Sequence, residues 1–332
     1  MIQPASREVF PGIIHISLPV PFKVEPVNVY FLAGEIPTII DTGVGTERTF
    51  EWLDKELRTF GFAAKEIRQV ILTHGHIDHS GLSGKIHRLT GSPVLLHASE
   101  WKEMKQVQYP TAENLKDQFR AFRSWGLAAD QVKQFDSMRQ ALNKLGTLPL
   151  EGIRLLNEGD VIQAGDHLLK PIFCPGHSAG SLCYYLTAGK VLFCGDHILA
   201  RISPNPCVVL DKKGMAQSGL PMYIDSLDRL ANYDVRMCLT GHGNSLSDLP
   251  GRIAAIKREH AERQQRFLAY LGEAGPCDLL QLTRVFLADL GKDRVEDLFL
   301  GMREAFGQVS LLEQKNLIQS EDVAGVRQYS LQ

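Results

Sequence analysis

The stretch that decides the fold reads Thr73-His74-Gly75-His76-Ile77-Asp78-His79-Ser80-Gly81. It places three imidazoles and one carboxylate within six residues, a set of donors that suits Zn²⁺, iron or manganese better than Ca²⁺ or Mg²⁺. The preceding run, Val70-Ile71-Leu72, is short, apolar and β-branched, which predicts the end of a buried strand. Side chains at the end of such a strand stand on a rigid element. The stretch therefore predicts a metal site with hydrolytic chemistry.

The spacing of these four side chains divides them into two pairs. His74 and His76 are two residues apart, so in an extended segment they point to the same side and can share one metal. Asp78 and His79 are adjacent and diverge from that pair, so they are free to serve a second metal. A loop rich in surface histidines is the alternative. The chain has only eleven histidines, too few to expect an H-x-H-x-D-H pattern by accident.

Further candidate ligands follow downstream, each after a short apolar run and beside a glycine. They are His177 in Gly176-His177, Asp196 in Gly195-Asp196 and His242 in Gly241-His242. Glycine lets the backbone turn sharply and approach closely, so the neighbouring side chains can converge on a shared centre. Each of these residues alone is typical of a hydrogen-bonded turn. Together with the first motif they favour metal ligation.

In order and spacing these motifs resemble those of the metallo-β-lactamase-fold hydrolases. The likeness extends upstream to Asn28-Val29-Tyr30-Phe31-Leu32 and Ile39-Ile40-Asp41-Thr42-Gly43, and it covers about residues 8–250. The resemblance implies an α/β fold, a four-layer αββα sandwich, that binds two divalent metal ions per chain. Zinc is the first expectation for these ions, with iron or manganese as alternatives. The implied ligands are His74, His76 and His177 at the first ion, Asp78, His79 and His242 at the second, and Asp196 bridging both.

Several residues near these motifs have expected supporting roles. Asp78 and Asp196 are the candidate catalytic residues as well as ligands. Asp41 is expected to orient a ligating imidazole or to fix the adjacent turn, because metal-bound histidines usually donate their second N–H to a partner. His197 is expected either to support Asp196 or to face the substrate. The six cysteines are scattered and predict buried thiols, with Cys174 and Cys194 close enough to the motifs to be minor candidates as ligands.

Composition limits the partners and the compartment. The chain is 44% hydrophobic, and its 36 basic and 38 acidic residues give a net charge of −2. That balance provides no general attraction to nucleic acid or to an anionic membrane. No run of about eighteen apolar residues occurs, so nothing is expected to span a membrane. The amino-terminal residues contain no apolar signal region, so we expect a reduced, cytoplasmic protein that acts on a small-molecule substrate.

The pattern of elements predicts two domains. Residues 1–252 form the expected catalytic domain, with helices at 46–60 and 80–89 and a helical insertion at about 99–150. The insertion carries apolar side chains at helical spacing, including Phe119 and Phe122. Two interpretations are open: these side chains form a small core of their own, or the insertion caps the metal cleft and presents them to a substrate. We expect the cap.

Residues 253–332 are expected to form three helices and a short hairpin. Their order resembles the winged-helix module found at the carboxyl end of some relatives in the same superfamily. A nucleic-acid-binding module should have a basic face, but this segment holds ten Lys and Arg against twelve Asp and Glu. It therefore predicts a packing or dimerisation element, which is compatible with a homodimer, rather than a site for nucleic acid.

The expected activity is hydrolysis of a small ester or thioester, resembling the glyoxalase II side of the superfamily. Two ions about 3.5–4 Å apart would share a bridging hydroxide formed from water whose pKa they lower. The alternative is a single-strand-specific ribonuclease or phosphodiesterase of the same fold, which the missing basic surface disfavours. A true β-lactamase fits poorly, because no export signal is visible and the bridging Asp196 departs from the pattern of the zinc lactamases. A diiron oxygen-reducing module is disfavoured because that branch usually carries Glu where His76 stands.

Overall fold

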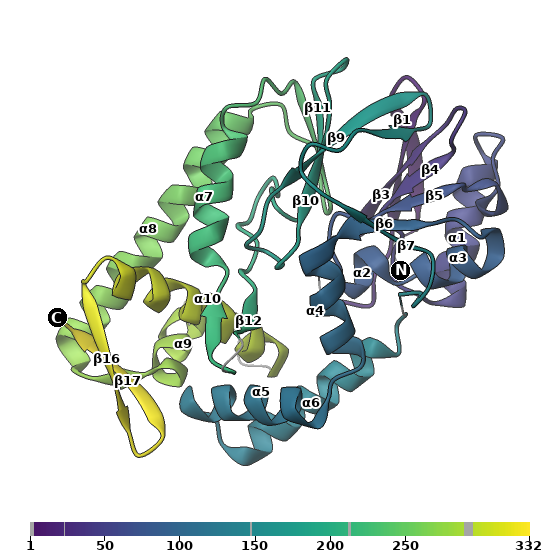
Figure 1. The fold of residues 1–332 in the computed structure, drawn as a ribbon. Coiled ribbons are helices and arrows are strands. Elements are labelled where there is room, and N and C mark those ends of the chain that lie inside the picture. Colours follow the sequence, from purple (N-terminus) through teal and green to yellow (C-terminus); the bar gives the residue numbers. More distant parts are fainter. Residues whose placement is uncertain (1–2, 23, 147, 212–213, 289–294) are drawn as a thin grey trace.

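The computed structural model describes residues 3–22, 24–146, 148–211, 214–288 and 295–332. Most of the strands in this part of the chain belong to two large sheets that lie face to face (Figure 1). The first sheet runs in chain order: β1 (Ala5–Phe10), β2 (Ile13–Leu18), β3 (Val27–Leu32), β4 (Thr38–Ile40), β5 (Gln69–Ile71), β6 (Val94–His97) and β7 (Ile153–Leu156). Its first four strands are antiparallel neighbours, and β4 to β7 are parallel.

The second sheet has the order β14-β11-β10-β9-β8. Its strands are β8 (Ile162–Ala164), β9 (His167–Phe173), β10 (Leu182–Leu186), β11 (Val191–Gly195) and β14 (Met237–Thr240). Only β11 and β14 are parallel neighbours within it. Parallel pairs need crossover connections, and in both sheets the crossovers carry helices or long loops. The connections that follow β5, β9, β11 and β14 carry the candidate ligands.

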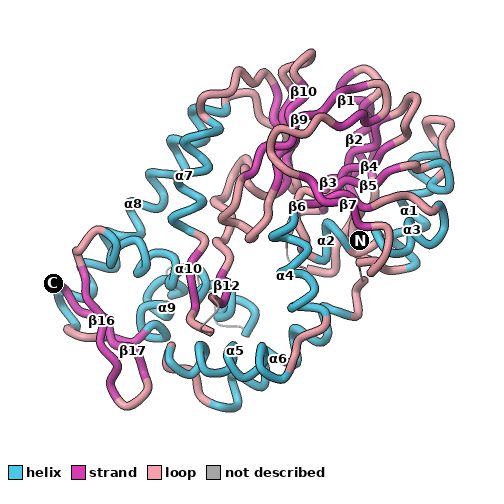
Figure 2. The backbone as a smooth tube through the Cα atoms, viewed as in Figure 1, coloured by secondary structure: helices cyan, strands magenta, loops and turns pink. Residues whose placement is uncertain are grey.

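Helices cover the outer face of each sheet (Figure 2). The first sheet is covered by α1 (Glu47–Arg58) and α3 (Ser83–Thr90), with the short α2 (Ile77–Ser80) and a 3₁₀ turn at Ala64–Glu66 between strands. The second sheet is covered by α7 (Leu220–Leu230) and α8 (Leu249–Ala274). The hydroxyl of Thr46 accepts a hydrogen bond from the backbone N–H of Thr49 at 3.1 Å, which caps the start of α1.

Three apolar layers confirm the four-layer αββα sandwich predicted from the sequence. Leu53 and Ile86 of the first helices pack on the outer face of the first sheet. Tyr30 and Phe193 meet edge-to-face between the two sheets, with ring centroids 5.3 Å apart. Leu227 of α7 lies in the layer beyond the second sheet. Burial of these faces is the main favourable term that holds the layers together.

The predicted helices agree with the structure to within a few residues. The prediction at 46–60 corresponds to α1, and the one at 80–89 divides into α2 and α3. Residues 99–150 hold α4 (Ala98–Gln108), α5 (Ala112–Ser124) and α6 (Ala129–Asn143). In the part of the chain that the structure describes, we find no helix with the length and apolar character needed to cross a membrane.

The carboxyl-terminal segment contains helices and a small sheet. After α8 come β15 (Cys277–Asp278), α9 (Leu279–Ala288), α10 (Val295–Gln314), β16 (Ile318–Val323) and β17 (Val326–Leu331). These three strands pair in the order β15-β17-β16, and a separate ribbon joins β12 (Val208–Leu210) to β13 (Ala216–Ser218). The predicted boundary at 252/253 falls inside α8, which is a single helix through that point. Division into two domains and the winged-helix assignment stay predictions.

The apolar side chains of the insertion do not form a core of their own. Phe122, Trp125 and Phe135 share one buried cluster with residues of α8, α9, α10 and the small sheet. The Trp125 ring lies 4.9 Å from the ring of Phe306 on α10. Figure 1 shows α5 and α6 running beside the carboxyl-terminal elements. These aromatic residues are therefore packed inside the protein rather than presented to a substrate, which corrects that part of the expectation for the cap.

Replacing Trp125 with alanine should lower the free energy of unfolding by about 3–5 kcal/mol, because it leaves a cavity in this shared core. Urea denaturation measured by circular dichroism gives that value. Tyr109→Ala is the control, since its side chain is on the same insertion but 53% exposed, and it should change stability by no more than about 0.5 kcal/mol. An equally small loss of stability in both variants would contradict the conclusion that the insertion and the carboxyl-terminal segment share a core.

Candidate metal centre

The seven predicted ligands meet where strands of both sheets end. His74 and His76 follow β5, and Asp78 and His79 stand in α2 directly afterwards. The other three come from the second sheet. They are His177 in the turn between β9 and β10, Asp196 after β11 and His242 after β14. The structure therefore brings together all seven residues that the sequence predicted as ligands.

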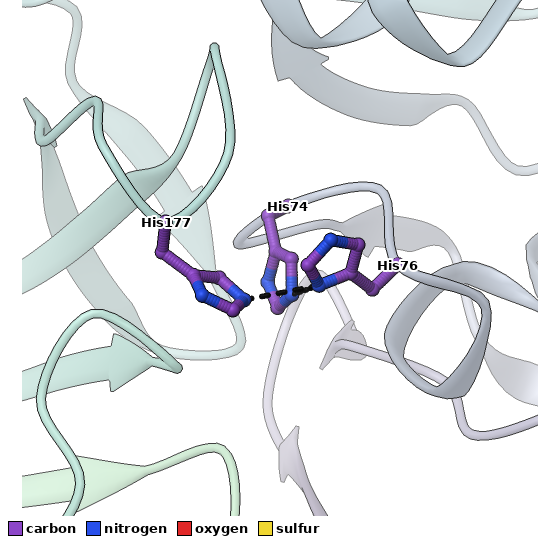
Figure 3. Close-up of side chains that lie close together, drawn as sticks. All are labelled: His74, His76 and His177. Carbon is purple, nitrogen blue, oxygen red and sulfur yellow. Dashed lines mark hydrogen bonds between the residues drawn. The ribbon is translucent and has the colours of Figure 1, made fainter. Parts of the chain in front are cut away.

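Three imidazoles form the first group of donors (Figure 3). The Nδ1 atom of His76 lies 3.0 Å from His74 Nε2 and 3.0 Å from His177 Nε2. The rings of His76 and His177 stand nearly perpendicular, at 88°. Nitrogens bound to one zinc ion at 2.0–2.1 Å in tetrahedral geometry lie roughly 3.3 Å apart. The separation and the aim of these atoms therefore fit a shared metal ion.

The second group combines Asp78, His79 and His242. The Nε2 atom of His242 lies 3.3 Å from His79 Nε2 and 3.4 Å from Asp78 Oδ2. Two imidazoles and a carboxylate are again a donor set that suits Zn²⁺, iron or manganese.

Asp196 lies between the two groups. Its Oδ1 is 3.4 Å from His79 Nε2, and its Oδ2 is 3.6 Å from His242 Nε2 and 3.7 Å from His177 Nε2. Oδ1 is buried and has no hydrogen-bond partner among the described residues. A buried carboxylate oxygen without a partner is costly unless a cation compensates it. The position of Asp196 thus fits a ligand shared by two ions.

Hydrogen bonds on the outer side fix the orientation of four imidazoles. His177 donates from Nδ1 to the carbonyl oxygen of Asn205 at 2.9 Å, and His242 donates from Nδ1 to the carbonyl oxygen of Glu25 at 2.9 Å. His79 Nδ1 donates to Asp41, and His74 Nδ1 donates to the hydroxyl of Thr73. In each case the Nε2 atom is left facing the centre. Such partners set the tautomer of a ligating histidine and strengthen it as a ligand.

Asp41 fulfils both roles expected from the sequence. Its Oδ2 accepts from His79 Nδ1 at 2.8 Å and from the hydroxyl of Thr73 at 2.8 Å, while Oδ1 accepts from the Thr73 N–H at 2.8 Å. Because the Thr73 hydroxyl donates to Asp41, it accepts from His74. The backbone of Asp41 is left-handed, with φ of 58°, a conformation that side chains rarely adopt. One carboxylate therefore positions an imidazole of each group.

Burial and charge set the protonation of the site. Burial lowers the pKa of His177 to about 4, so that imidazole is neutral at physiological pH. Burial would raise the pKa of Asp196, but the neighbouring His242 and His79 hold it well below its usual range. Burial likewise lowers the pKa of His242, but Asp196 and Asp78 outweigh it and raise that pKa to about 9. A metal ion in the second group would replace the proton that His242 otherwise holds.

Glu100, at the start of α4, is a residue of the site to which the sequence analysis gave no role. Its carboxylate accepts from the Gly75 N–H at 2.6 Å, from the Ser178 hydroxyl at 2.6 Å and from the Gly180 N–H at 2.8 Å. It therefore joins the two loops that carry the first group. Burial, together with the charge of Glu103, raises the pKa of Glu100 to about 7.

The first helix of the insertion is packed directly on the ligand loop. A Cβ atom at Gly75 would collide with the sulfur of Met104, and one at Gly180 would collide with the backbone of Glu100. At Gly180, where the obstacle is backbone, only glycine allows this approach. The insertion therefore lies against the site, as predicted, only through α4. Helices α5 and α6 pack in the core that the insertion shares with the carboxyl-terminal segment.

Other residues that the sequence singled out lie behind the site. His197 is 1% exposed and packs on the ring of Tyr223, so it does not face a substrate. Cys174 and Cys194 are buried in the layer beyond the second sheet and belong to none of the ligand groups. The loop that contains Asn205 supports His177 from outside.

Comparison with known proteins agrees with this geometry. The metallo-beta-lactamase superfamily matches residues 22–242, two thirds of the chain. A probable metallo-hydrolase of Bacillus subtilis, YqjP, is 26% identical over 93% of this chain and 94% of its own length. The human acyl-coenzyme A thioesterase MBLAC2 is 29% identical over 75% of this chain and 80% of its own. A solved metallo-beta-lactamase family protein of Thermus thermophilus superimposes with a TM-score of 0.83, at 25% identity, over 98% of this chain and 100% of its own.

The chain belongs to the metallo-β-lactamase superfamily. This membership confirms the family resemblance and the predicted enzyme class, a metal-dependent hydrolase.

Purified protein loaded with Zn²⁺ and dialysed should contain two ions per chain by elemental analysis, because two groups of donors share Asp196. His177→Ala should retain about one, since it removes a donor from the first group only. His167→Ala, a histidine of β9 outside the ligand groups, is the control and should retain two. A single ion in the wild-type protein would contradict the assignment of two groups.

Glu100→Ala should weaken Zn²⁺ affinity by about 10–100-fold, because it releases the backbone of both loops that hold the first group. Competition with a chromophoric chelator measures that affinity. Glu113→Ala on the exposed start of α5 removes the same charge without touching the site and should leave affinity unchanged. Unaltered affinity in Glu100→Ala would show that the two loops hold their positions without this carboxylate.

Proposed function

We propose that this member of the metallo-β-lactamase superfamily hydrolyses small thioesters by a dinuclear mechanism with water as the nucleophile. The observation that carries the proposal is the position of Asp196 between two complete groups of donors. Two divalent ions at such a site polarise the carbonyl of a bound substrate and lower the pKa of water toward neutrality. The donor types suit zinc, with iron or manganese as alternatives.

The residues of the chain contribute orientation and protonation state. The outward Nδ1 bonds of the four fixed histidines keep their Nε2 atoms directed at the centre, so no reorganisation is needed when a substrate arrives. Asp196 stays ionised because His242 and His79 lower its pKa. Asp78 stays ionised as well: burial would raise its pKa, but the hydrogen bond from His242 and the charge of His79 lower it.

The identity of the nucleophile follows from the side chains at the site. All six cysteines lie within the described residues, are buried and belong to none of the ligand groups. The hydroxyl of Ser178 is occupied by Glu100 and Ser181. Neither the cysteines nor Ser178 is therefore placed to attack a substrate. Water is therefore the nucleophile that this arrangement supports.

A thioester is favoured over the other bonds that such a site can hydrolyse. MBLAC2, named as an acyl-coenzyme A thioesterase, aligns with three quarters of this chain. The net charge of −2 provides no overall attraction to the phosphates that a ribonuclease must neutralise. The thioester carbonyl is also more electrophilic than that of an oxygen ester, which suits attack by water at a metal site.

The test is a panel of acyl-coenzyme A and acyl-N-acetylcysteamine thioesters, oxygen esters, a phosphodiester and single-stranded RNA, assayed with the Zn²⁺-loaded protein. We expect thioesters to have the highest kcat/KM, and chelation to abolish the activity. Asp196→Ala should lower kcat by more than tenfold, a cost above about 1.4 kcal/mol in the barrier.

Asp130→Ala on the exposed start of α6 is the matched control and should keep wild-type kcat. Preferred cleavage of RNA or the phosphodiester would refute the proposed substrate class. An Asp196→Ala variant with more than a tenth of wild-type kcat would refute the role given to that carboxylate.

A further inference from the structure

Helix α10 of the carboxyl-terminal segment contacts the loop that supports His177 through Arg303. The Nε atom of Arg303 donates to the carbonyl oxygen of Pro206 at 3.2 Å. The preceding residue, Asn205, is the one whose carbonyl accepts from the ligand His177 at 2.9 Å. One turn further along α10, a Cβ at Gly307 would lie 3.0 Å from the ring of Pro206. The helix therefore lies against the loop that holds a ligand.

The guanidinium carbon of Arg303 lies 6.0 Å from the centre of the Phe299 ring, and its two terminal nitrogens are left without a polar contact among the described residues. Neither Nη atom makes a hydrogen bond or ion pair with a described residue, although the side chain is half-buried. The nearby carboxylate of Glu103 accepts from the Ala179 N–H at 3.1 Å instead. A half-buried arginine with unused donors has given up much of its hydration. It presents the planar fork that binds carboxylates and phosphates in pairs of hydrogen bonds.

The charge of Arg303 acts on the metal centre itself. Burial is the main cause of the lowered pKa of His76 and of His177, and the positive charge of Arg303 lowers both further. The same charge acts on Glu103 and on Cys207, beside the loop. Arg303 is thus a cation close enough to His76 and His177 to act on both, held beside the loop that supports His177.

We propose that Arg303 binds an anionic group of the substrate, a carboxylate on the acyl chain close to the thioester. The inference rests on the proposed thioesterase function and specifies its substrate class. The phosphates of a coenzyme A or carrier-protein thioester offer the same chemistry, but they lie at the far end of a long linker from the sulfur. The position of Arg303 beside the loop of a ligand favours the acyl side.

The experiment compares two N-acetylcysteamine thioesters of equal chain length, succinyl and its methyl ester, which differ in one charge. Arg303→Gln should raise KM for the succinyl thioester by about 10–100-fold, the loss expected for a charge-assisted hydrogen-bonded pair, with kcat altered by less than about threefold. For the uncharged methyl ester, KM should stay within about threefold of wild type. Arg303→Lys should lower KM for the succinyl thioester part of the way back to the wild-type value, because lysine restores the charge but not the planar pair of N–H donors.

Two controls accompany these variants. Arg258→Gln removes an exposed arginine of α8 and should leave both KM values unchanged. Zinc content and the circular dichroism spectrum of Arg303→Gln should match those of the wild type, which shows that the site and fold are intact.

A second pair of substrates, butanoyl-coenzyme A and butanoyl-N-acetylcysteamine, distinguishes the source of the anion. If Arg303→Gln raises KM for the coenzyme A thioester alone, the anion is a phosphate and the acyl-side proposal is wrong. If Arg303→Gln raises KM equally for the charged and the neutral substrates, Arg303 does not bind an anion and the proposal is wrong. A wild-type protein inactive on every thioester would refute the proposed function, and this inference with it.

Discussion

The structure depends on one constraint: several buried imidazoles must aim the same nitrogen at a common centre. Their opposite nitrogens are therefore fixed from outside, by Asp41, by Thr73 and by the carbonyls of Glu25 and Asn205. These four partners come from segments far apart in the chain, and only the two-sheet sandwich brings them to the same edge. Left-handed backbone at Asp41 is tolerated because its carboxylate serves both ligand groups at once.

Features of the site that depend on neighbouring residues in the chain could be predicted from the sequence. Features that depend on contacts between distant segments could not. The ligands could be predicted because four of them stand in one H-x-H-x-D-H motif and the other three each follow an apolar run beside a glycine, and their types alone restrict the chemistry. The backbone carbonyls that orient His177 and His242 could not be predicted, because every residue has a carbonyl oxygen and the residue type does not show which one accepts the bond. Glu100 was missed for a related reason. Nothing distinguishes it from other glutamates until α4 is placed on the ligand loop.

The packing partners of the insertion could not be predicted from the sequence either. Periodicity showed that the insertion has an apolar face, but it could not show what that face covers. In the structure Trp125 packs on Phe306, more than 180 positions away in the chain. The insertion and the carboxyl-terminal segment therefore share one core, and each contacts a loop of the site: Glu100 bonds to the ligand loop at Gly75, and Arg303 bonds to Pro206 beside the residue that supports His177.

Helix α8 has a consequence for how the molecule can move. Its 26 residues extend over about 39 Å. Its first turns are buried against the second sheet through Ile253 and Ile256, and its last turns against the shared core through Phe267 and Leu271. A helix held at both ends in this way acts as a strut that resists bending between the halves. Opening of the site by a hinge motion of the carboxyl-terminal half would break either the helix or one of its two cores. We therefore expect access to the site to depend on motions of loops and side chains rather than on a hinge between the two ends of α8.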